Sequence, residues 1–372
     1  MKILAFYLPQ FHAIKENDEW WGKGFTEWTN LKTAKPTYRG HKQPRVPLGK
    51  NYYSLLDVDT LKWQAELARK YGVYGFVYYH YWFEEGMLLE RPAELMLKHP
   101  EVKLPFCFSW ANHTWSRNWA NKSDSILRKQ TYGGEDEWRR HFDYLLPFFN
   151  DKRYIQVGGR PLMILYNPRK VSEFPEMITC WQKWAREAGF KEGLCIVHQE
   201  NEFNHEAPEN RGLYDYGIEF QMNDAVHDFM RNNWKFAAER VLNRIADKLP
   251  FLRCEATTMH YTYDEIWQRV IVKEPNSDTW FPGAFVDWDN TPRRKNRGQI
   301  CTQVTPEKFK KYLTIQVKRA REVYHKDYLF MFAWNEWGES GYLEPDELYG
   351  YKMLEAVRDA LNANNEFPEY PL

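Results

Sequence analysis

Two glutamates near the carboxyl-terminal end of the chain, Glu336 and Glu339, have the type and spacing of a catalytic pair. They lie in the run Trp334-Asn-Glu-Trp-Gly-Glu339. Three residues apart, they point to opposite faces of a strand, but on a helical turn, which Gly338 permits, their Cβ atoms lie about 5 to 6 Å apart. Retaining glycosidases hold their two carboxyl groups about 5 to 5.5 Å apart. A pair at this spacing is more often two solvated loop carboxylates, but the flanking rings and amide favour the catalytic interpretation.

Aromatic and polar side chains crowd the positions that directly follow apolar runs. Tyr78-Tyr-His-Tyr-Trp82 and Trp110-Ala-Asn-His-Thr-Trp115 are two examples. Rings stack on the C–H faces of a sugar, while amide, imidazole and carboxylate groups exchange hydrogen bonds with its hydroxyls. We therefore expect a carbohydrate substrate. The side chains expected to contact it are Tyr7, Trp28, Tyr79, His80, Trp82, Trp110, Asn112, His113, Tyr166, Asp287, Trp334 and Asn335.

The order of apolar segments predicts an α/β fold, a (β/α)8 TIM-type barrel. Runs rich in Val, Ile, Phe and Tyr predict strands near 3–8, 74–80, 104–110, 160–166, 194–199, 216–221, 282–287 and 328–334. Apolar residues at helical spacing predict helices at 58–71, 135–149, 173–188 and 306–324. In such barrels the active site lies at the carboxyl ends of the strands. An open doubly wound sheet would give much the same order of elements, and periodicity leaves that alternative open.

We expect one catalytic domain over residues 1–372, because barrels of this type run from about 200 to over 400 residues. The composition, 43% hydrophobic and 17% aromatic, supplies ample apolar area for one large core. The segment 223–279, between the sixth and seventh strands, is longer than a normal crossover. It is therefore predicted to be an inserted helical subregion.

Charge and cysteine usage exclude several classes of protein. Lys plus Arg and Asp plus Glu both total 51, so no net field favours nucleic acid or an anionic membrane. No window approaches 18 apolar residues and the start lacks a secretory pattern, which predicts a cytoplasmic protein without membrane insertion. The five cysteines form no CxxC pair and the histidines lack tight ligand spacing, so neither metal nor other cofactor is expected. The basic run Arg293-Arg-Lys-Asn-Arg297 is interpreted as a solvated loop, with contact to an anionic substituent as the alternative.

Six blocks of the sequence resemble the WbsX group, which is glycosyltransferase-like and related to glycoside hydrolase family 99. The blocks are Ala5-Phe-Tyr-Leu-Pro-Gln-Phe-His12, Gly24-Phe-Thr-Glu-Trp28, Tyr78-Tyr-His-Tyr-Trp82, Trp110-Ala-Asn-His113, Trp288-Asp-Asn-Thr-Pro-Arg293 and the Trp334 to Glu339 run. The resemblance implies a retaining endo-acting mannosidase-like barrel. It also implies that Glu336 acts as a base on the sugar 2-hydroxyl, giving a 1,2-anhydro intermediate, and that Glu339 is the general acid and then the base. Ser340 departs from the glycine usual in family 99, so mannose specificity is not carried over.

Two other functions fit parts of the sequence. A glycosyltransferase of cell-surface polysaccharide synthesis could use Asp287-Trp-Asp289 as a DxD motif for a metal-bound diphosphate, although Asp57-Val-Asp59 has the same pattern. No glycine-rich phosphate loop follows a predicted strand. A sugar-binding protein without activity would keep the aromatic residues and would need neither glutamate.

Overall fold

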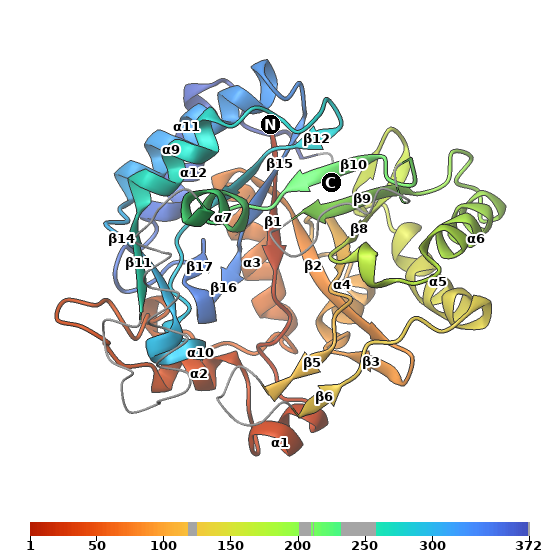
Figure 1. Cartoon of the computed structure of the whole chain (residues 1–372), viewed down its shortest axis with the longest axis horizontal. Helices are drawn as coiled ribbons and strands as arrows, with labels where there is room; N and C mark the ends of the chain where they lie inside the picture. Colours follow the sequence, from red (N-terminus) through yellow and green to blue (C-terminus); the bar gives the residue numbers. More distant parts are fainter. Residues whose placement is uncertain (118–124, 201–209, 211, 232–257, 371–372) are drawn as a thin grey trace.

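Parallel strands form a nearly closed ring at the centre of the molecule (Figure 1). The structure, a computed structural model, describes residues 1–117, 125–200, 210, 212–231 and 258–370. Around the ring lie β1 (Lys2–Tyr7), β2 (Val73–Phe83), β4 (Phe106–Trp110), β8 (Arg160–Leu165), β9 (Cys195–Glu200), β10 (Tyr216–Glu219), β12 (Trp280–Phe281), β13 (Gly283–Phe285) and β15 (Tyr328–Phe332).

The ring closes through two short strands. β12 pairs with β10 and β13 pairs with β15, and Pro282 alone separates them. Proline lacks the N–H that a continuous strand would donate, which explains the interruption. The predicted (β/α)8-type barrel is confirmed, with β12 and β13 in the place of its seventh strand, and the open doubly wound alternative is wrong.

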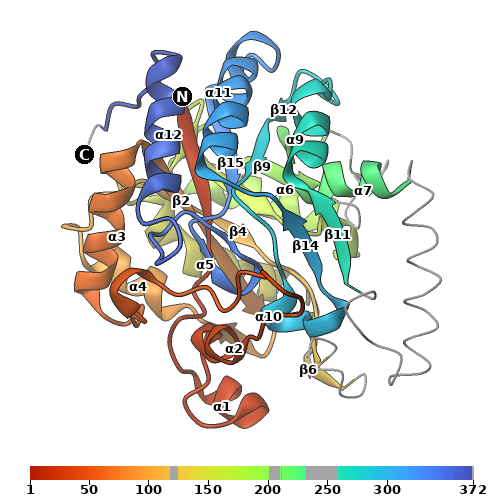
Figure 2. The same ribbon diagram turned by 90° about the vertical axis from the view of Figure 1, so that its left-hand side faces the viewer.

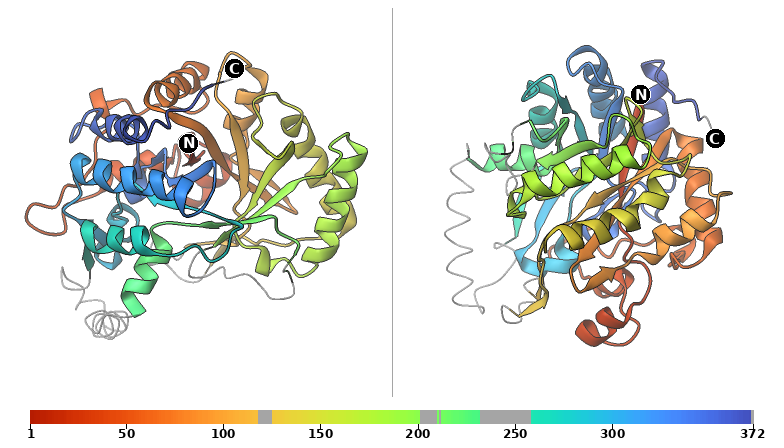
Figure 3. Two further views of the ribbon diagram at one scale, coloured as in Figure 1. Left: turned by 90° about the horizontal axis from the view of Figure 1, so that it is seen from above. Right: turned by 90° about the vertical axis from the view of Figure 1, so that its right-hand side faces the viewer.

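Helices cover the outside of the ring (Figures 2 and 3). They are α3 (Val58–Tyr71), α4 (Arg91–Lys98), α5 (Glu135–Phe149), α6 (Phe174–Glu187), α9 (Tyr263–Val272), α11 (Pro306–Glu322) and α12 (Lys352–Ala363). The predicted ranges 58–71 and 135–149 match α3 and α5. The side chain of Asp57 caps the start of α3, and Gly72, at φ 87°, ends it in the left-handed conformation. Among the described helices, none combines the length and the hydrophobicity that a membrane span requires.

The predicted insertion at 223–279 is described in part, since residues 232–257 lie outside the described residues. Its described part contains α7 (Asn223–Arg231), β11 (Met259–Thr262) and α9. β11 is a strand where only helices were predicted, and it pairs in parallel with β14 (Gln299–Thr302). Buried and half-buried residues alternate along β11, as expected for a strand with one covered face.

Short elements cover the carboxyl ends of the strands, at the lower edge of Figure 1. They include α1 (Lys15–Trp21), α2 (Glu27–Thr33), the hairpin of β5 (Trp115–Ser116) and β6 (Ile126–Arg128), and α10 (Thr291–Arg294). The main hydrophobic core extends from β1 to α12, and a smaller cluster, which includes Tyr81 and Phe83 of β2, packs against Trp20 of α1 and Trp115 of β5. The barrel thus brings segments from both halves of the chain together at one end.

Gly283 is expected to be essential for closing the ring. A Cβ atom at this position would lie 1.9 Å from the backbone oxygen of Glu219 in β10. Gly283→Ala should therefore force the two strands apart and lower the free energy of unfolding by about 2 to 3 kcal/mol. Urea unfolding measures this. Gly134→Ala, whose Cβ would meet nothing within 4 Å, is the control and should cost less than about 1 kcal/mol; equal losses in the two variants would contradict the argument.

Candidate active site

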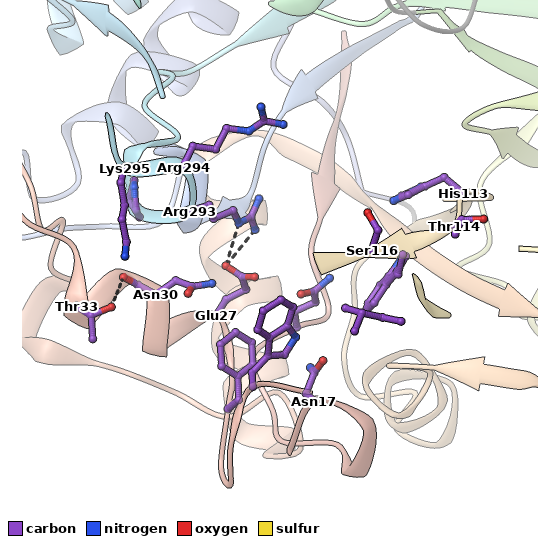
Figure 4. A pocket seen from close by; sticks show the side chains of 16 residues that line it. Asn17, Glu27, Asn30, Thr33, His113, Thr114, Ser116, Arg293, Arg294 and Lys295 are labelled. Atoms are coloured by element: carbon purple, nitrogen blue, oxygen red, sulfur yellow. Dashed lines mark hydrogen bonds and ion pairs between the residues drawn. The ribbon is translucent and has the colours of Figure 1, made fainter. Parts of the chain in front are cut away.

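The guanidinium of Arg293 binds three carboxylates at once. Its Nη2 donates to Glu336 Oε1, its Nη1 lies 3.1 Å from Glu339 Oε1, and its Nε donates to Glu27 Oε2 over 3.1 Å. The side chains of Arg293, Glu27 and Glu336 are 8%, 1% and 5% exposed, whereas that of Glu339 is 22% exposed. The two glutamates singled out by spacing therefore meet at one cation. We call these four residues the Arg293 cluster; Figure 4 shows Arg293 beside Glu27.

A tight turn after β15 brings Glu336 and Glu339 together. Asn335–Glu336 form β16, a single 3₁₀ turn follows at Trp337–Glu339, and Gly341–Tyr342 return as β17. Gly338 is needed here for space rather than for a positive φ. A Cβ atom on it would lie 2.6 Å from Arg293 Nε and 2.7 Å from Glu27 Oε2. Only glycine lets the turn pack directly against the ion pairs.

A buried carboxylate, Glu344, stabilises the turn at Trp337–Glu339 through hydrogen bonds. It accepts hydrogen bonds from the indole nitrogens of Trp334, at 3.0 Å, and Trp337, at 2.7 Å. Gln64 Nε2 and the Tyr53 hydroxyl complete its partners at 2.7 and 2.8 Å. Burial raises the pKa of Glu344 to about 7. The four hydrogen bonds lower this pKa, but the effect of burial is larger. The two tryptophans on either side of Glu336 are thus fixed by hydrogen bonds as well as by packing.

Asn335 ties the same turn to the end of β1. Its side-chain oxygen accepts from the Leu8 amide at 2.7 Å, and its Nδ2 donates to the Leu8 carbonyl at 3.0 Å. An amide is suited to this double contact because it carries both a donor and an acceptor. Asn335 therefore positions the glutamate that follows it.

The charge state of Glu336 is strongly perturbed. Burial raises its pKa to about 8; Arg293 opposes this shift, and the negative charges of Glu339 and Glu27 add to it. One guanidinium shared among three carboxylates stabilises each less than an exclusive pair would. The free protein near neutral pH therefore keeps a proton on Glu336.

Glu336 and Glu339 open into a cavity of about 410 Å³, which we call the central cavity. This volume lies within the range of about 300 to 1,000 Å³ found for ligand pockets. Besides Arg293, Glu336 and Glu339, rings and amides line it: Gln10, Tyr79, Tyr81, His113, Trp115, Tyr166, Phe220, Asn223, Trp288, Asn290, Gln299 and Phe332. This lining can stack on and hydrogen-bond to a sugar ring.

Of the predicted substrate contacts, Tyr79, His113 and Tyr166 line the central cavity with the two glutamates. His80, Trp82 and Trp110 do not. Side chains alternate along β2, so Tyr79 and Tyr81 face the cavity while His80 and Trp82 face α5. His80 Nε2 lies 2.9 Å from His141 Nε2, and burial lowers the pKa of His80 to about 3.

The other predicted contacts also lie outside the central cavity and have partners within the protein. Asn112 bonds the backbone nitrogen and oxygen of Asn167, at 2.6 and 2.7 Å, and so joins the ends of β4 and β8. Tyr7 donates to Gln64, Trp28 to the Tyr53 carbonyl, and Asp287 pairs with Arg45, while Trp334 and Asn335 have the roles described above. These residues stabilise the elements around the central cavity and do not line it.

Arg293 is the main residue that sequence reasoning missed. The basic run 293–297 was interpreted as a solvated loop, and that interpretation is wrong for Arg293, which is buried, although Arg294 and Lys295 are exposed. Helix α10 turns Arg293 inward, toward Glu27 and the glutamate pair. Glu27, which lies in the block Gly24-Phe-Thr-Glu-Trp28, is the partner that could have drawn attention to it.

The DxD segment is occupied by internal partners. Asp287 Oδ2 accepts from Arg45 at 2.7 Å, and Asp289 Oδ2 lies 2.7 Å from both His41 Nε2 and Gln43 Nε2. Asp289 Oδ1 also accepts from the Thr291 hydroxyl. These contacts leave the two carboxylates poorly placed to hold a metal-bound diphosphate.

Comparison with known families gives one match over nearly the whole chain. Residues 3–357 match the family model described as glycosyltransferase WbsX. The uncharacterized protein WxcX of Xanthomonas campestris pv. campestris, in strains ATCC 33913 and B100, is 34% identical over 362 residues. The match covers 96% of this chain and 49% of WxcX. The chain thus spans about half the length of the curated relatives it matches.

Solved structures with a similar fold include glycoside hydrolases. A GH99 endo-alpha-mannosidase from Bacteroides thetaiotaomicron superposes with a TM-score of 0.53 at 14% identity, over 98% of this chain and 97% of the other. A glycoside hydrolase-like protein gives a TM-score of 0.57 at 12% identity, over 96% and 93% of the two chains. At these identities the similarity is one of fold.

Glu344→Gln should destabilise the protein by about 2 to 4 kcal/mol. The amide retains one acceptor oxygen, so buried donors such as the Trp337 indole and the Tyr53 hydroxyl lose their partner, at about 1 to 3 kcal/mol each. Urea unfolding at pH 8, where the Glu344 carboxyl is ionised, measures the loss. Glu322→Gln, on the exposed side of α11, is the control and should change stability by less than about 0.5 kcal/mol. A Glu344→Gln variant as stable as the control would refute this role.

Proposed function

The chain belongs to the glycosyltransferase WbsX family, and we propose that it is a retaining glycoside hydrolase acting on an oligo- or polysaccharide through Glu336 and Glu339. The observation that carries this proposal is the convergence of both glutamates on Arg293 at the edge of a ring-lined cavity. This cavity lies at the carboxyl ends of the barrel strands, where barrel enzymes carry their active sites. The similarity in fold to glycoside hydrolases agrees with it.

In the first step of the proposed reaction, Glu336 removes the proton from the 2-hydroxyl of the sugar. The freed oxygen attacks C1 as the bond to the leaving oxygen breaks, and Glu339 donates a proton to that oxygen. In the second step, Glu339 takes a proton from water, the water oxygen attacks C1, and O2 regains its proton from Glu336. Two displacements at C1 restore the original configuration, so the product retains it.

The environment of each glutamate suits its proposed role. A base that must deprotonate a weakly acidic hydroxyl works best with a pKa near the working pH, and the pKa of Glu336 is raised to about 8. About one tenth of the Glu336 side chains are then ionised at pH 7. Glu339, at 22% exposure, is the more accessible of the pair, as expected for the group that meets the leaving oxygen and water.

A glycosyltransferase is the second candidate, because the family description names that activity. Such an enzyme would require a sugar nucleotide as donor. The internal hydrogen bonds of Asp287 and Asp289 weigh against a DxD-type metal site, which is why hydrolysis is the leading proposal.

Glu336→Gln and Glu339→Gln should each lower turnover at least about 1,000-fold, because each removes a group that moves a proton in the transition state. Release of reducing ends from a panel of bacterial and fungal glycans, without nucleotide or added metal, is the measurement. Glu66→Gln, an exposed change on α3, should keep full activity. Turnover that appears only with a sugar nucleotide would support the transferase instead. Sugar binding without turnover in the unchanged protein would indicate a non-catalytic role.

The pH profile should assign the base. Glu336 acts only when ionised, so its titration should give the pH profile of kcat/KM a rising limb with a midpoint near pH 8. Glu27→Gln removes a nearby negative charge and frees Arg293 for Glu336; both effects lower the pKa of Glu336, and the rising limb should move to lower pH. A rising limb that stays in place in Glu27→Gln, or a profile without any rising limb, would contradict Glu336 as the base.

A further inference from the structure

A second cavity of about 330 Å³, shown in Figure 4, adjoins the central cavity because several residues line both. We call it the side cavity. The two cavities share the residues Gln10, His113, Trp115, Arg293 and Arg294 in their walls. A chain of sugars with one ring in the central cavity can therefore extend a neighbouring ring into the side cavity.

We propose that the side cavity binds an acidic sugar, one that carries a carboxylate or a phosphate, next to the bond that is cleaved. This inference rests on the proposed carbohydrate-cleaving function of the central cavity. It assigns a substrate class to the enzyme, an anionic glycan, which the overall charge balance does not indicate.

The wall of the side cavity contains more positive than negative side chains. Arg293, Arg294 and Lys295 line it together with one carboxylate, Glu27. Glu27 is engaged by Arg293, which is itself surrounded by carboxylates. The side chains of Arg294 and Lys295 are exposed, and within the described part of the chain they form no ion pair or hydrogen bond. Two positive charges thus remain for an anionic ligand.

The polar groups of the side cavity match a sugar rather than a bare ion. Asn17 is 2% exposed, yet its Nδ2 has no hydrogen-bond partner among the described residues, and the same holds for His113 Nδ1 and Glu27 Oε1. Figure 4 shows Asn17, His113 and Glu27 on different sides of the cavity. Buried polar atoms are nearly always hydrogen-bonded, so this set is suited to a ligand with several hydroxyls.

Aromatic rings supply the remaining contacts that a sugar needs. Trp21, Phe25 and Trp115 line the side cavity, and the Trp21 and Phe25 ring centroids lie 5.8 Å apart. The C–H face of a pyranose can stack on such rings while its acidic group reaches Arg294 and Lys295. Rings, donors and cations in one wall indicate a sugar with a negative substituent.

The test measures binding, which requires no turnover. Saturation-transfer NMR titrations compare glucuronate and glucose 6-phosphate with neutral glucose, using the full chain. Both acidic sugars, or one of them, should bind more tightly than glucose, and the difference between the two identifies the preferred anion. R294Q/K295Q should weaken acidic-sugar binding about tenfold and leave glucose unchanged. K183Q/K318Q removes two exposed charges elsewhere and is the matched control.

Trp21→Ala tests the location, because Trp21 lines the side cavity and not the central one. It should weaken binding of all three sugars. Equal binding of acidic and neutral sugars, unchanged binding in R294Q/K295Q, or no binding of either acidic sugar would overturn the proposal. Binding that depends on Arg294 and Lys295 without any glycan cleavage would uphold this proposal and refute the hydrolase. Cleavage of neutral glycans alone would support the hydrolase and refute the acidic-sugar site.

Discussion

Three carboxylates in one poorly hydrated space repel one another, and Arg293 is the cation that offsets this repulsion. Two like charges about 4 Å apart cost on the order of 4 kcal/mol at the effective dielectric constant of a protein site. Glu27, Glu336 and Glu339 would carry three negative charges against one positive charge if all were ionised. A proton on Glu336 removes part of this imbalance, and it is the pKa of this carboxyl that is raised. Burial is the largest cause of this rise in pKa; the negative charges of Glu339 and Glu27 add to it, and Arg293 opposes it.

The surrounding structure serves to keep this unfavourable arrangement in place. Glu344 fixes the tryptophans on both sides of Glu336, and Asn335 ties the turn to the end of β1. Beside the turn, Gln43 donates to both Asp289 and Ser340. Each of these contacts fills a buried hydrogen-bonding group, so a shift of the turn would leave several groups unpaired. The cost of that loss is what prevents the carboxylates from relaxing apart.

The sequence predicts the barrel well because its signals are local. Apolar runs mark the strands, and α3 ends where expected because Asp57 and Gly72 are adjacent to it in sequence. The orientation of β2 is different. Both faces of this strand are buried, so its aromatic run does not reveal whether Tyr79 or His80 faces the cavity. Predictions based on strand ends alone therefore include residues that line the cavity, such as Tyr79, and residues that face the surrounding helices, such as His80.

The Arg293 cluster could not be predicted from local sequence signals, because its members come from distant parts of the chain. Arg293 stands in a basic run whose neighbours are exposed, and its partner Glu27 is 266 residues away in sequence. Only the closed ring brings α2, α10 and the end of β15 to the same place. The glutamate pair is visible in sequence because both members lie on one short turn; their shared cation is not.

Hydrolysis and glycosyl transfer are closely related outcomes at a site of this kind. In the proposed reaction the second step begins when a hydroxyl group attacks C1, and Glu339 removes its proton. Water and the hydroxyl of a second sugar are chemically equivalent in that step. The nucleophile that reaches Glu339 in the second step would decide between the two outcomes. A transferase and a hydrolase could therefore use the same proposed pair, Glu336 and Glu339, and the family's description as glycosyltransferase WbsX is compatible with either.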